Sequence, residues 1–253
     1  MDISKKYEVI IVGGSYAGLS SAMALGRSLR SVLIVDSGQP CNRQTPYSHN
    51  FLTRDGQTPD DIAEIALSQV LNYDTVAHLQ DKVASVTRSN SGFEVRTNAG
   101  KVLNGRKILF ATGVKDIMPA IKGFAECWGI SVLHCPYCHG YEVAGKALGI
   151  IANGDIAFDL CKLIRHWSDK LTLFTNGKSE LTDDQYDMIG KLNIEIVEKE
   201  IAELKHTNGN LDRLTFTDGS ETELAAVFAR VGFEHHCDIP VQLGCKVTEQ
   251  GYI

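Results

Sequence analysis

The stretch that decides the fold is Glu8-Val9-Ile10-Ile11-Val12-Gly13-Gly14-Ser15-Tyr16-Ala17-Gly18. Its first half is a β-branched run, which is typical of a strand buried on both faces of a parallel sheet. Its second half is a glycine turn with the pattern G-x-S-x-x-G, and a segment rich in Ala, Leu and Ser follows to about Leu29. A second apolar run, residues 32–35, ends at Asp36. The pattern predicts a strand–helix–strand unit at the start of the chain.

The glycine turn lies where a dinucleotide fingerprint belongs, directly after a strand and at the start of a helix. Ser15 occupies the middle glycine position, which must be small so that backbone amides can approach a pyrophosphate. Asp36 ends the second strand, where a carboxylate accepts hydrogen bonds from ribose hydroxyls. The alternative is a tight turn of an ordinary α/β protein with Asp36 at its surface. We predict a bound dinucleotide, and FAD in preference to a nicotinamide cofactor, because a separate second unit follows.

The rest of the chain predicts a second unit of the same kind. Before it, the sequence indicates a helix over 59–71, a β-meander from about 76 to 103 and a buried strand over 107–113. The second unit comprises a strand over 147–152, a helix over 154–166, a strand over 171–175, a helix opening at 182, and strands near 193–197, 201–207 and 211–217. The predicted fold class is α/β, with two three-layer, Rossmann-like nucleotide-binding domains, the second inserted in the first. The expected boundaries are 1–115 and 232–253 for the FAD-binding domain and 116–231 for the inserted domain.

A Cys-x-x-Cys motif, Cys135-Pro136-Tyr137-Cys138, lies between the two units, with His134 before it and His139 after it. Two cysteines at this spacing can close and reopen a small disulfide, and the flanking histidines offer proton acceptors near neutral pH. A zinc site is an alternative, although adjacent ligands at both ends fit tetrahedral spacing poorly. A purely structural disulfide is rare in a reducing compartment. We predict thiol–disulfide exchange and no metal.

Composition and net charge limit the kinds of partner that we expect for this protein. The chain has 253 residues and a formal net charge of −6, which argues against nucleic acid or an anionic membrane surface as the main partner. No run approaches the roughly 20 apolar residues that span a bilayer, and the first residues lack the apolar core of a signal peptide. We therefore expect a cytoplasmic protein. Of the seven cysteines five stand alone, so the chain does not carry a disulfide framework; Cys41, near the presumed flavin edge, is interpreted as an incidental thiol.

The chain resembles the low-molecular-weight thioredoxin reductase family of flavin disulfide oxidoreductases. The resemblance is carried, over essentially the whole chain, by 13–18, Asp36, Asn50, 111–113, Pro119, Gly123 and the Cys-x-x-Cys motif. It implies that the dithiol lies in the inserted domain, with Cys138 facing the flavin and Cys135 exchanging with the external substrate, and that the protein is a homodimer. The implied FAD contacts are Gly13, Ser15, Tyr16, Ala17, Gly18, Asp36, Ser37, Asn50, Ala111, Thr112 and Gly113.

His139 departs from the family, because it stands where thioredoxin reductases usually carry an aspartate. Its ordinary pKa suits a general acid and base near neutral pH, so we name it as catalytic together with Cys135 and Cys138. The substitution resembles the dithiol oxidases that close disulfides in small natural products such as gliotoxin, with oxygen as oxidant. His235 and His236 are further acid–base candidates, or simply polar loop histidines.

The second glycine turn also departs from the family. It reads Ala152-Asn-Gly-Asp-Ile-Ala157 and keeps only the middle glycine. After the next strand, Thr175-Asn-Gly177 and Lys178 replace the basic cluster that grips the NADPH 2′-phosphate in thioredoxin reductases. NADPH binding is therefore doubtful. Family members also continue past a Gly251-Tyr252-Ile253 into a segment that completes the flavin site, so we expect either a fragment or a naturally shortened protein.

The function predicted from these features is an FAD-dependent thiol–disulfide oxidoreductase that does not use NADPH in the usual way. It would either oxidise dithiols with oxygen or reduce a thioredoxin-like partner with electrons from another donor. Its substrate would be a small-molecule dithiol or disulfide, or a thioredoxin-like protein. Two alternatives stay open: an NADPH-dependent thioredoxin reductase, and a non-catalytic redox-sensing or binding protein on a reductase scaffold.

Overall fold

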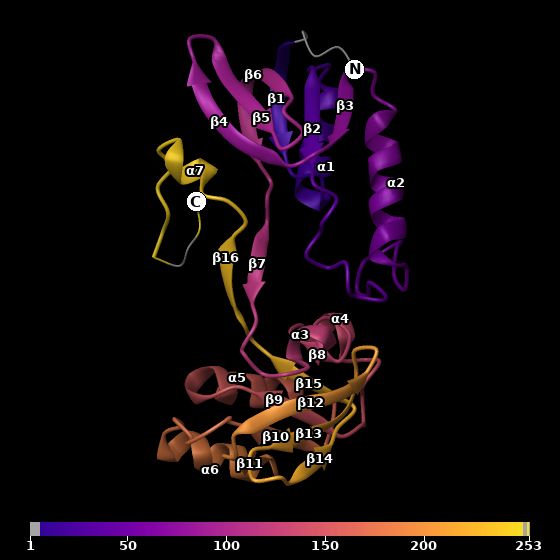
Figure 1. The fold of residues 1–253 in the computed structure, drawn as a ribbon. Coiled ribbons are helices and arrows are strands. Elements are labelled where there is room, and N and C mark those ends of the chain that lie inside the picture. The colour runs from indigo at the N-terminus through magenta and orange to yellow at the C-terminus, as the bar shows by residue number, and fades with distance from the viewer. Residues whose placement is uncertain (1–5, 250–251, 253) are drawn as a thin grey trace. The chain divides into compact units, whose positions relative to one another are not determined.

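The computed structural model describes residues 6–249 and residue 252 (Figure 1). Residues 1–5, 250, 251 and 253, which include most of the Gly251-Tyr252-Ile253 end named above, lie outside the described residues. The chain divides into two compact units. The first contains the described residues up to 43, residues 59–116 and the residues from 233 onward; the second contains residues 44–58 and 117–232. The predicted α/β class, with one nucleotide-binding-like domain inserted in another, is confirmed.

The first unit is built on a six-stranded sheet in the order β3-β2-β1-β6-β5-β4. Strands β3, β2, β1 and β6 run parallel, and β5 and β4 add an antiparallel edge. The strands are β1 (Lys6–Val12), β2 (Val32–Asp36), β3 (Val76–Gln80), β4 (Val83–Ser89), β5 (Gly92–Thr97) and β6 (Val102–Phe110). The helices are α1 (Tyr16–Arg27), α2 (Pro59–Leu71) and the short α7 (Ile239–Gln242).

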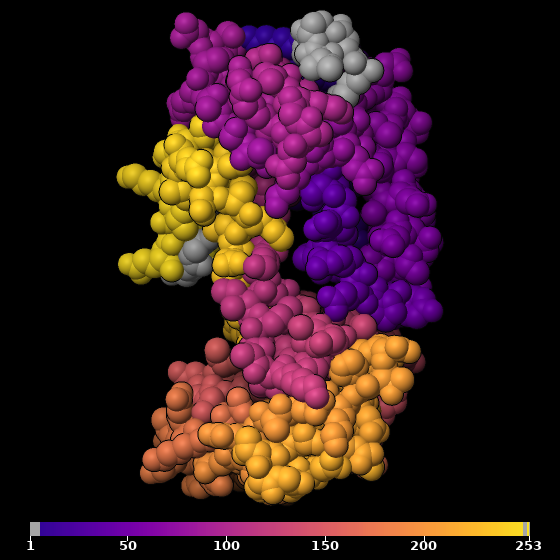
Figure 2. All heavy atoms as spheres, viewed as in Figure 1, coloured from indigo at the N-terminus to yellow at the C-terminus, as the bar shows by residue number. Residues whose placement is uncertain are grey.

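Both faces of this sheet are buried, as the β-branched runs predict. Ile11 and Ile34 share a cluster with Leu19 of α1 and Val70 of α2. The alternate residues of the same strands form the core of the other face, to which Ile239 of α7 contributes. Residues 237–243 thus pack on the sheet of the first unit, and in Figure 2 this part of the chain is drawn as yellow spheres next to the purple ones.

The second unit contains a five-stranded parallel sheet in the order β11-β10-β9-β15-β8 and a three-stranded antiparallel sheet in the order β12-β13-β14. The strands are β8 (Val132–Leu133), β9 (Leu148–Ile151), β10 (Leu171–Phe174), β11 (Glu195–Val197), β12 (Ile201–Thr207), β13 (Asn210–Phe216), β14 (Glu221–Glu223) and β15 (Ala226–Ala229). The helices are α3 (Phe124–Cys127), α4 (Pro136–His139), α5 (Gly154–Ile164) and α6 (Asp183–Lys191).

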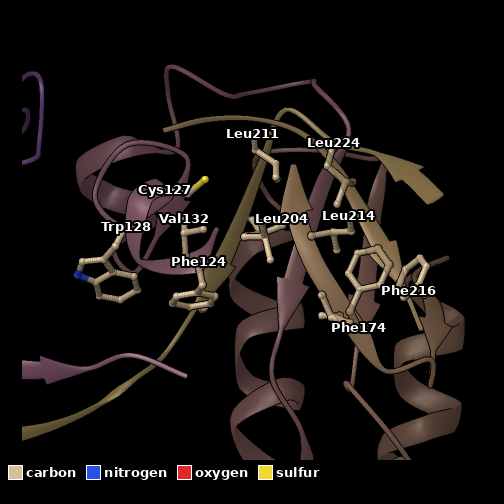
Figure 3. Packing of buried hydrophobic residues seen from close by; sticks show 13 residues of the cluster. Phe124, Cys127, Trp128, Val132, Phe174, Leu204, Leu211, Leu214, Phe216 and Leu224 are labelled. Carbon is tan, nitrogen blue, oxygen red and sulfur yellow. The ribbon is translucent and has the colours of Figure 1, made fainter. Parts of the chain in front are cut away.

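The two sheets of the second unit share a hydrophobic core. Figure 3 shows Phe174 of the parallel sheet beside Phe216 of the antiparallel sheet, and their ring centroids are 5.8 Å apart. Phe124 of α3 stacks on Trp128 in the same cluster. Helix α5 contributes to a second cluster with α6, through Cys161 and Ile189. The motif-bearing α4 is therefore attached to a unit with a substantial core of its own.

Two short strands, β7 (Val114–Ile117) and β16 (Gly232–His235), pair with each other where the chain passes between the units. The ammonium of Lys115 lies 2.9 Å from a carboxylate oxygen of Glu234 across this pair.

The segment 44–58 differs from the predicted domain boundaries. The sequence places it in the FAD-binding domain, whereas the structure groups it with the second unit. The reason is a set of tertiary contacts that the local sequence pattern does not predict. The side-chain amide of Gln44 donates to the carbonyl of Ala125, and His49 lies against Glu142. The roles assigned to the two domains stay predictions. Within the described residues, no helix has both the length and the apolarity needed to cross a membrane.

Candidate active site

Cys135 and Cys138 form a closed disulfide at the start of α4, and their Cα atoms lie 5.4 Å apart. Cys135 is the N-cap of the helix, and Pro136 occupies its first turn, where a missing N–H costs nothing. The backbone N–H groups of Cys138 and His139 both donate to the carbonyl of Cys135, at 3.2 Å. This single helical turn is what brings the two cysteines together. Both are partly exposed, so the disulfide is open to exchange.

Gly140, which directly follows α4, packs very closely against Pro136 and Trp167. A Cβ atom at this position would lie 2.5 Å from the Pro136 carbonyl oxygen and 2.5 Å from Nε1 of Trp167. Trp167 also meets the ring of Tyr137 edge-on, with the centroids 5.6 Å apart. A side chain at Gly140 would therefore force the Pro136 backbone, the Trp167 ring or both to shift.

His134 and His139 flank the two cysteines in the sequence. Burial lowers the pKa of His139 below its ordinary value, and electrostatic interactions with His134 and His49 lower it further, while Glu142 acts in the opposite direction. His139 is therefore neutral near pH 7, which is the form that accepts a proton from a thiol. His134 is exposed and stacks on Trp128 at 5.7 Å between ring centroids.

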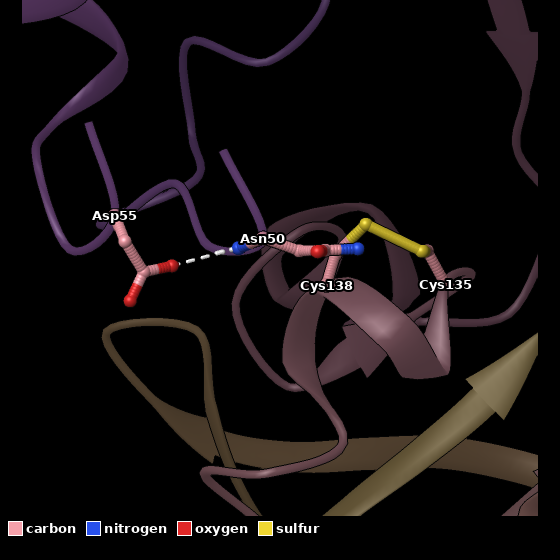
Figure 4. The surroundings of a disulfide bond; sticks show 4 residues. All are labelled: Asn50, Asp55, Cys135 and Cys138. Atoms are coloured by element: carbon pink, nitrogen blue, oxygen red, sulfur yellow. Dashed lines mark hydrogen bonds between the residues drawn. A yellow bond between two sulfur atoms is a disulfide. The ribbon is translucent and has the colours of Figure 1, made fainter. Parts of the chain in front are cut away.

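His49 enters this site from the segment 44–58. Its Nε2 lies 3.4 Å from Oε1 of Glu142, and its Nδ1 lies 3.7 Å from Oδ1 of Asp55. The same Asp55 oxygen accepts a hydrogen bond of 2.7 Å from the backbone N–H of Asn50. Figure 4 shows Asn50 and Asp55 in the surroundings of the disulfide. The sequence analysis did not identify His49 or Glu142 as site residues. Two signals were available: His49 is adjacent to Asn50, and Glu142 lies three residues after His139.

Asn50 has a left-handed backbone, with φ 58°, which asparagine tolerates better than most residues. The structure groups it with the disulfide-bearing unit, and its contact with FAD stays a prediction.

The first glycine turn brings a strand and a helix into very close contact. A Cβ atom on Gly13, whose φ is +103°, would lie 2.3 Å from the Ala111 carbonyl oxygen. A Cβ atom on Gly18 would lie 1.9 Å from the Gly13 carbonyl oxygen. The two glycines are thus required by the packing of β1, α1 and the end of β6. This is the tight turn that a pyrophosphate needs at a helix N-terminus.

The groups around this turn fit a dinucleotide. Ser15 is the N-cap of α1, yet its side chain makes no capping hydrogen bond, and the first turn contains no acidic residue. The carboxylate of Asp36 accepts from the N–H of Gly14 at 2.9 Å and from the N–H of Gly38 at 3.0 Å, one on each oxygen. Each oxygen keeps acceptor capacity for a ribose hydroxyl.

The other predicted FAD contacts of the first unit lie around the same turn. Ser15, Tyr16, Ala17 and Ser37 are exposed, and Ala111 and Thr112 are half-buried. Gly113 has φ +66° and open space where a Cβ atom would stand. The structure brings Gly13, Ala111 and Asp36 together through β1, β6 and β2, and Asn50 is the one predicted contact that belongs to the other unit.

The second glycine turn is built differently. The side chain of Asn153 caps α5: its Oδ1 accepts from the N–H of Gly154 at 2.9 Å and from the N–H of Glu180 at 2.8 Å. Its Nδ2 donates to the Lys178 carbonyl at 2.9 Å. Asp155 lies in the first helical turn, and the Glu180 carboxylate is 3.8 Å from the position of a Cβ atom on Gly154. The N-terminus of α5, which carries the positive end of the helix dipole, is therefore already capped by a side-chain oxygen and has acidic side chains nearby.

A pocket of about 350 Å³ lies at the carboxyl ends of the parallel strands of the second unit. Its wall is mainly apolar, and Asn153, Thr175, Asn176 and Arg230 supply its polar groups. The carboxyl end of a parallel sheet is where α/β proteins bind ligands.

Two histidines remain among the candidates named from the sequence. His235 is half-buried and His236 exposed, and both belong to the first unit, so their acid–base role stays a prediction. In the described part of the chain, no group of three or more His, Cys, Asp or Glu side chains is arranged to hold a metal ion.

The sequence matches a known family and several known proteins. The family described as pyridine nucleotide-disulphide oxidoreductase matches residues 7–253. A thioredoxin reductase of Claviceps purpurea is 34% identical, over 87% of this chain and 72% of that protein. One of Aspergillus oryzae is 32% identical, over 96% of this chain and 82% of that protein.

Solved structures agree with the sequence relatives. An oxidoreductase from Agrobacterium tumefaciens superposes with a TM-score of 0.90 and 35% identity, over 97% of this chain and 81% of the other. A putative thioredoxin reductase from Bacillus anthracis gives a TM-score of 0.91 and 31% identity, over 96% of this chain and 82% of the other.

Proposed function

The chain belongs to the pyridine nucleotide-disulphide oxidoreductase family, and we propose that within it the protein oxidises small-molecule dithiols without NADPH. It is a thioredoxin reductase-like, FAD-dependent disulfide oxidoreductase. The observation that carries the finer proposal is the start of α5, where Asn153, Asp155 and Glu180 occupy the surroundings in which a second dinucleotide would place its pyrophosphate.

The disulfide accepts two electrons from the substrate by two exchanges. A substrate thiolate attacks Sγ of Cys135, a new S–S bond forms, and Cys138 leaves as the thiolate. The second substrate thiol loses its proton to the neutral ring of His139 and attacks the mixed disulfide, from which Cys135 leaves. The substrate is then a disulfide, and the cysteine pair has gained two electrons; of the two substrate protons, one is on His139 and the other passed to solvent when the first substrate thiol ionised. His139 suits this work because its lowered pKa keeps it neutral near pH 7.

FAD, when bound, supplies two-electron transfer from the reduced cysteine pair to a final acceptor, for which we propose molecular oxygen, reduced with two protons to hydrogen peroxide. The residues proposed to hold it are the uncapped start of α1, the carboxylate of Asp36 and the turn at 111–113, with Ser37 and Asn50 as further contacts. The close approaches at Gly13 and Gly18 support this assignment, because they create the turn that a pyrophosphate requires.

The second unit fits a pyrophosphate poorly. Backbone N–H groups at a helix start attract phosphate, but here the Asn153 side chain already takes the N–H of Gly154, and two carboxylates add like charge. The turn after β10 is also closed on itself: the hydroxyl of Thr175 donates to the Gly177 carbonyl at 2.6 Å. Within the segment 175–178 the one basic residue is Lys178, so the turn itself has no guanidinium fork of the kind that recognises a 2′-phosphate best; Arg230 lines the pocket beside Thr175 and Asn176.

An anaerobic titration of the flavin-loaded protein tests the proposal. The flavin absorbance should bleach with a small dithiol such as reduced lipoamide, recover on admission of air, and be unaffected by equimolar NADPH. Rapid bleaching by NADPH would overturn the proposal. Bleaching by neither reagent would overturn it as well.

One observation favours a second candidate, an NADPH-dependent thioredoxin reductase. The pocket of about 350 Å³ lies at the strand ends where nucleotides bind in this type of sheet, and similar proteins carry the name thioredoxin reductase. A thioredoxin-like protein would then be the partner, and bleaching by NADPH is the outcome that selects this candidate. A homodimer and a cytoplasmic location stay predictions for either candidate.

A further inference from the structure

The pocket of the second unit has an apolar wall that is part of the unit's own core. Phe124 lines the pocket, is 1% exposed and belongs to the core cluster that also contains Phe174. Ile121 and Ile151 line the pocket as well and pack against the same cluster. Because the core holds these side chains in place, the wall is formed before any ligand binds. Its volume of about 350 Å³ suits a small ligand with an apolar body.

The polar side chains of the lining differ in whether the fold already uses them. Asn153 and Thr175 hold the turns described above. The side-chain oxygen of Asn176 accepts a hydrogen bond of 2.7 Å from the N–H of Ile201. Arg230 is different, since its guanidinium forms no hydrogen bond or ion pair with any described residue. It is also the one charged residue among the described residues that line the pocket, and a guanidinium is always protonated.

The charges around the pocket are divided between its two sides. Strand β9 lies between β10 and β15, and Arg230 directly follows β15. Asp155 lies in the first turn of α5, and Glu180 follows β10 and approaches the same helix start at Gly154. A pyrophosphate would bind at that helix start, which here carries carboxylates. The lining therefore favours one anionic group at the end of β15, and not the two phosphates of a dinucleotide at α5.

We propose that this pocket binds a small monocarboxylic acid with an aromatic or branched apolar body. The carboxylate pairs with Arg230, whose planar fork matches two carboxylate oxygens with two parallel hydrogen bonds. The apolar body packs against Phe124 and Ile151. The inference goes beyond the proposed dithiol chemistry and does not depend on it, because the binding of the acid uses neither the disulfide nor the flavin.

Calorimetric titration of the full-length protein with 2-naphthoate tests the proposal, and 2-naphthamide is the matched ligand, with the same rings and no charge. Naphthoate should bind roughly tenfold more tightly than naphthamide, because only the anion pairs with the guanidinium. Arg230→Gln should weaken the binding of naphthoate by roughly tenfold or more and leave that of naphthamide unchanged. Ala152→Leu puts a larger side chain into the lining and should weaken both ligands.

Arg54→Gln is the control for the loss of a positive charge. Arg54 belongs to the same unit but does not line the pocket, so this variant should bind both ligands as the native protein does. Thermal melts check that each variant is folded. A loss of naphthoate affinity that is confined to Arg230→Gln and Ala152→Leu supports the proposal.

Three results would overturn the proposal: no binding of naphthoate at millimolar concentration, equal affinity in the native protein and Arg230→Gln, or displacement of bound naphthoate by stoichiometric NADPH. The last result would make the pocket a nucleotide site. None of these measurements involves turnover. If naphthoate binds as expected while no dithiol is oxidised, the proposed function fails and the acid site stands.

Discussion

Cys138 carries the two-electron step in the proposed chemistry, since it is the sulfur that leaves first when Cys135 is attacked. Cys138→Ser should abolish turnover and leave flavin binding intact, because no residue of the first unit is altered. Visible absorbance of the purified protein reports the flavin, and oxygen consumption with a dithiol reports turnover. Cys41→Ser is the control, since Cys41 is an exposed free thiol, and it should keep activity. Dithiol oxidation that survives in Cys138→Ser would remove this cysteine from the mechanism.

We expect the pH dependence of dithiol oxidation to come from the protonation of His139. Burial and two neighbouring histidines lower its pKa, so the neutral, proton-accepting form exists above that lowered value. Activity should therefore hold at neutral pH and fall only as the pH drops below about 6.5, the ordinary value for histidine. His139→Asn should lower kcat by about 10²–10⁴-fold and lose this acid limb. A pH–rate profile from 5 to 8 measures both, and an unchanged limb in His139→Asn would assign the titration to another group.

At the scale of single elements, the glycine turn makes a prediction about packing. A Cβ atom on Gly18 would lie 1.9 Å from the Gly13 carbonyl oxygen, so Gly18→Ala must move α1 away from β1. We expect a loss of about 1–3 kcal/mol in the free energy of unfolding, together with weakened FAD binding. Chemical denaturation and flavin fluorescence measure the two effects.

Gly190 supplies the matched control for this substitution. It lies in α6 with nothing within 4 Å of a Cβ atom, so Gly190→Ala should be neutral or stabilise the protein by about 0.5–1 kcal/mol. Equal effects of the two substitutions would show that helix propensity, and not the close approach, decides the outcome at Gly18.

Elements were predictable where the signal is local. The β-branched run before Gly13 and the capping box at Thr182 both specify an element by themselves, and the structure has β1 and α6 there. The segment 44–58 carries no such signal, because its position depends on contacts with residues about 80 to 90 positions away, such as the bond from Gln44 to Ala125. The same limit hid His49: a lone histidine becomes a site residue only when the fold brings Glu142 to it.

At the scale of the whole molecule, each of the two units has its own hydrophobic core, and we propose that only the core of the first unit is needed to bind the flavin. The clusters of the first unit and those of the second have no residue in common. Ile11 of β1 and Ile150 of β9 are both fully buried in central parallel strands, one in each unit. Substitutions at these two residues therefore form a matched pair, which tests whether flavin binding depends on the core of the first unit and not on the core of the second.

Each of the two truncations should destabilise its own unit by about 2–5 kcal/mol, since each removes buried methyl groups and leaves a cavity. Ile11→Ala should speed amide hydrogen exchange in β1, β2 and β6 and reduce flavin retention, because Ile11 supports the strand that leads into Gly13. Ile150→Ala should speed exchange in β9, β10 and β15 and leave flavin retention unchanged. Mass-spectrometric exchange with peptide resolution separates the two patterns. If either substitution accelerated exchange equally in both sets of strands, the units would unfold as one cooperative body, and the assignment of flavin and dithiol to separate cores would lose its energetic basis.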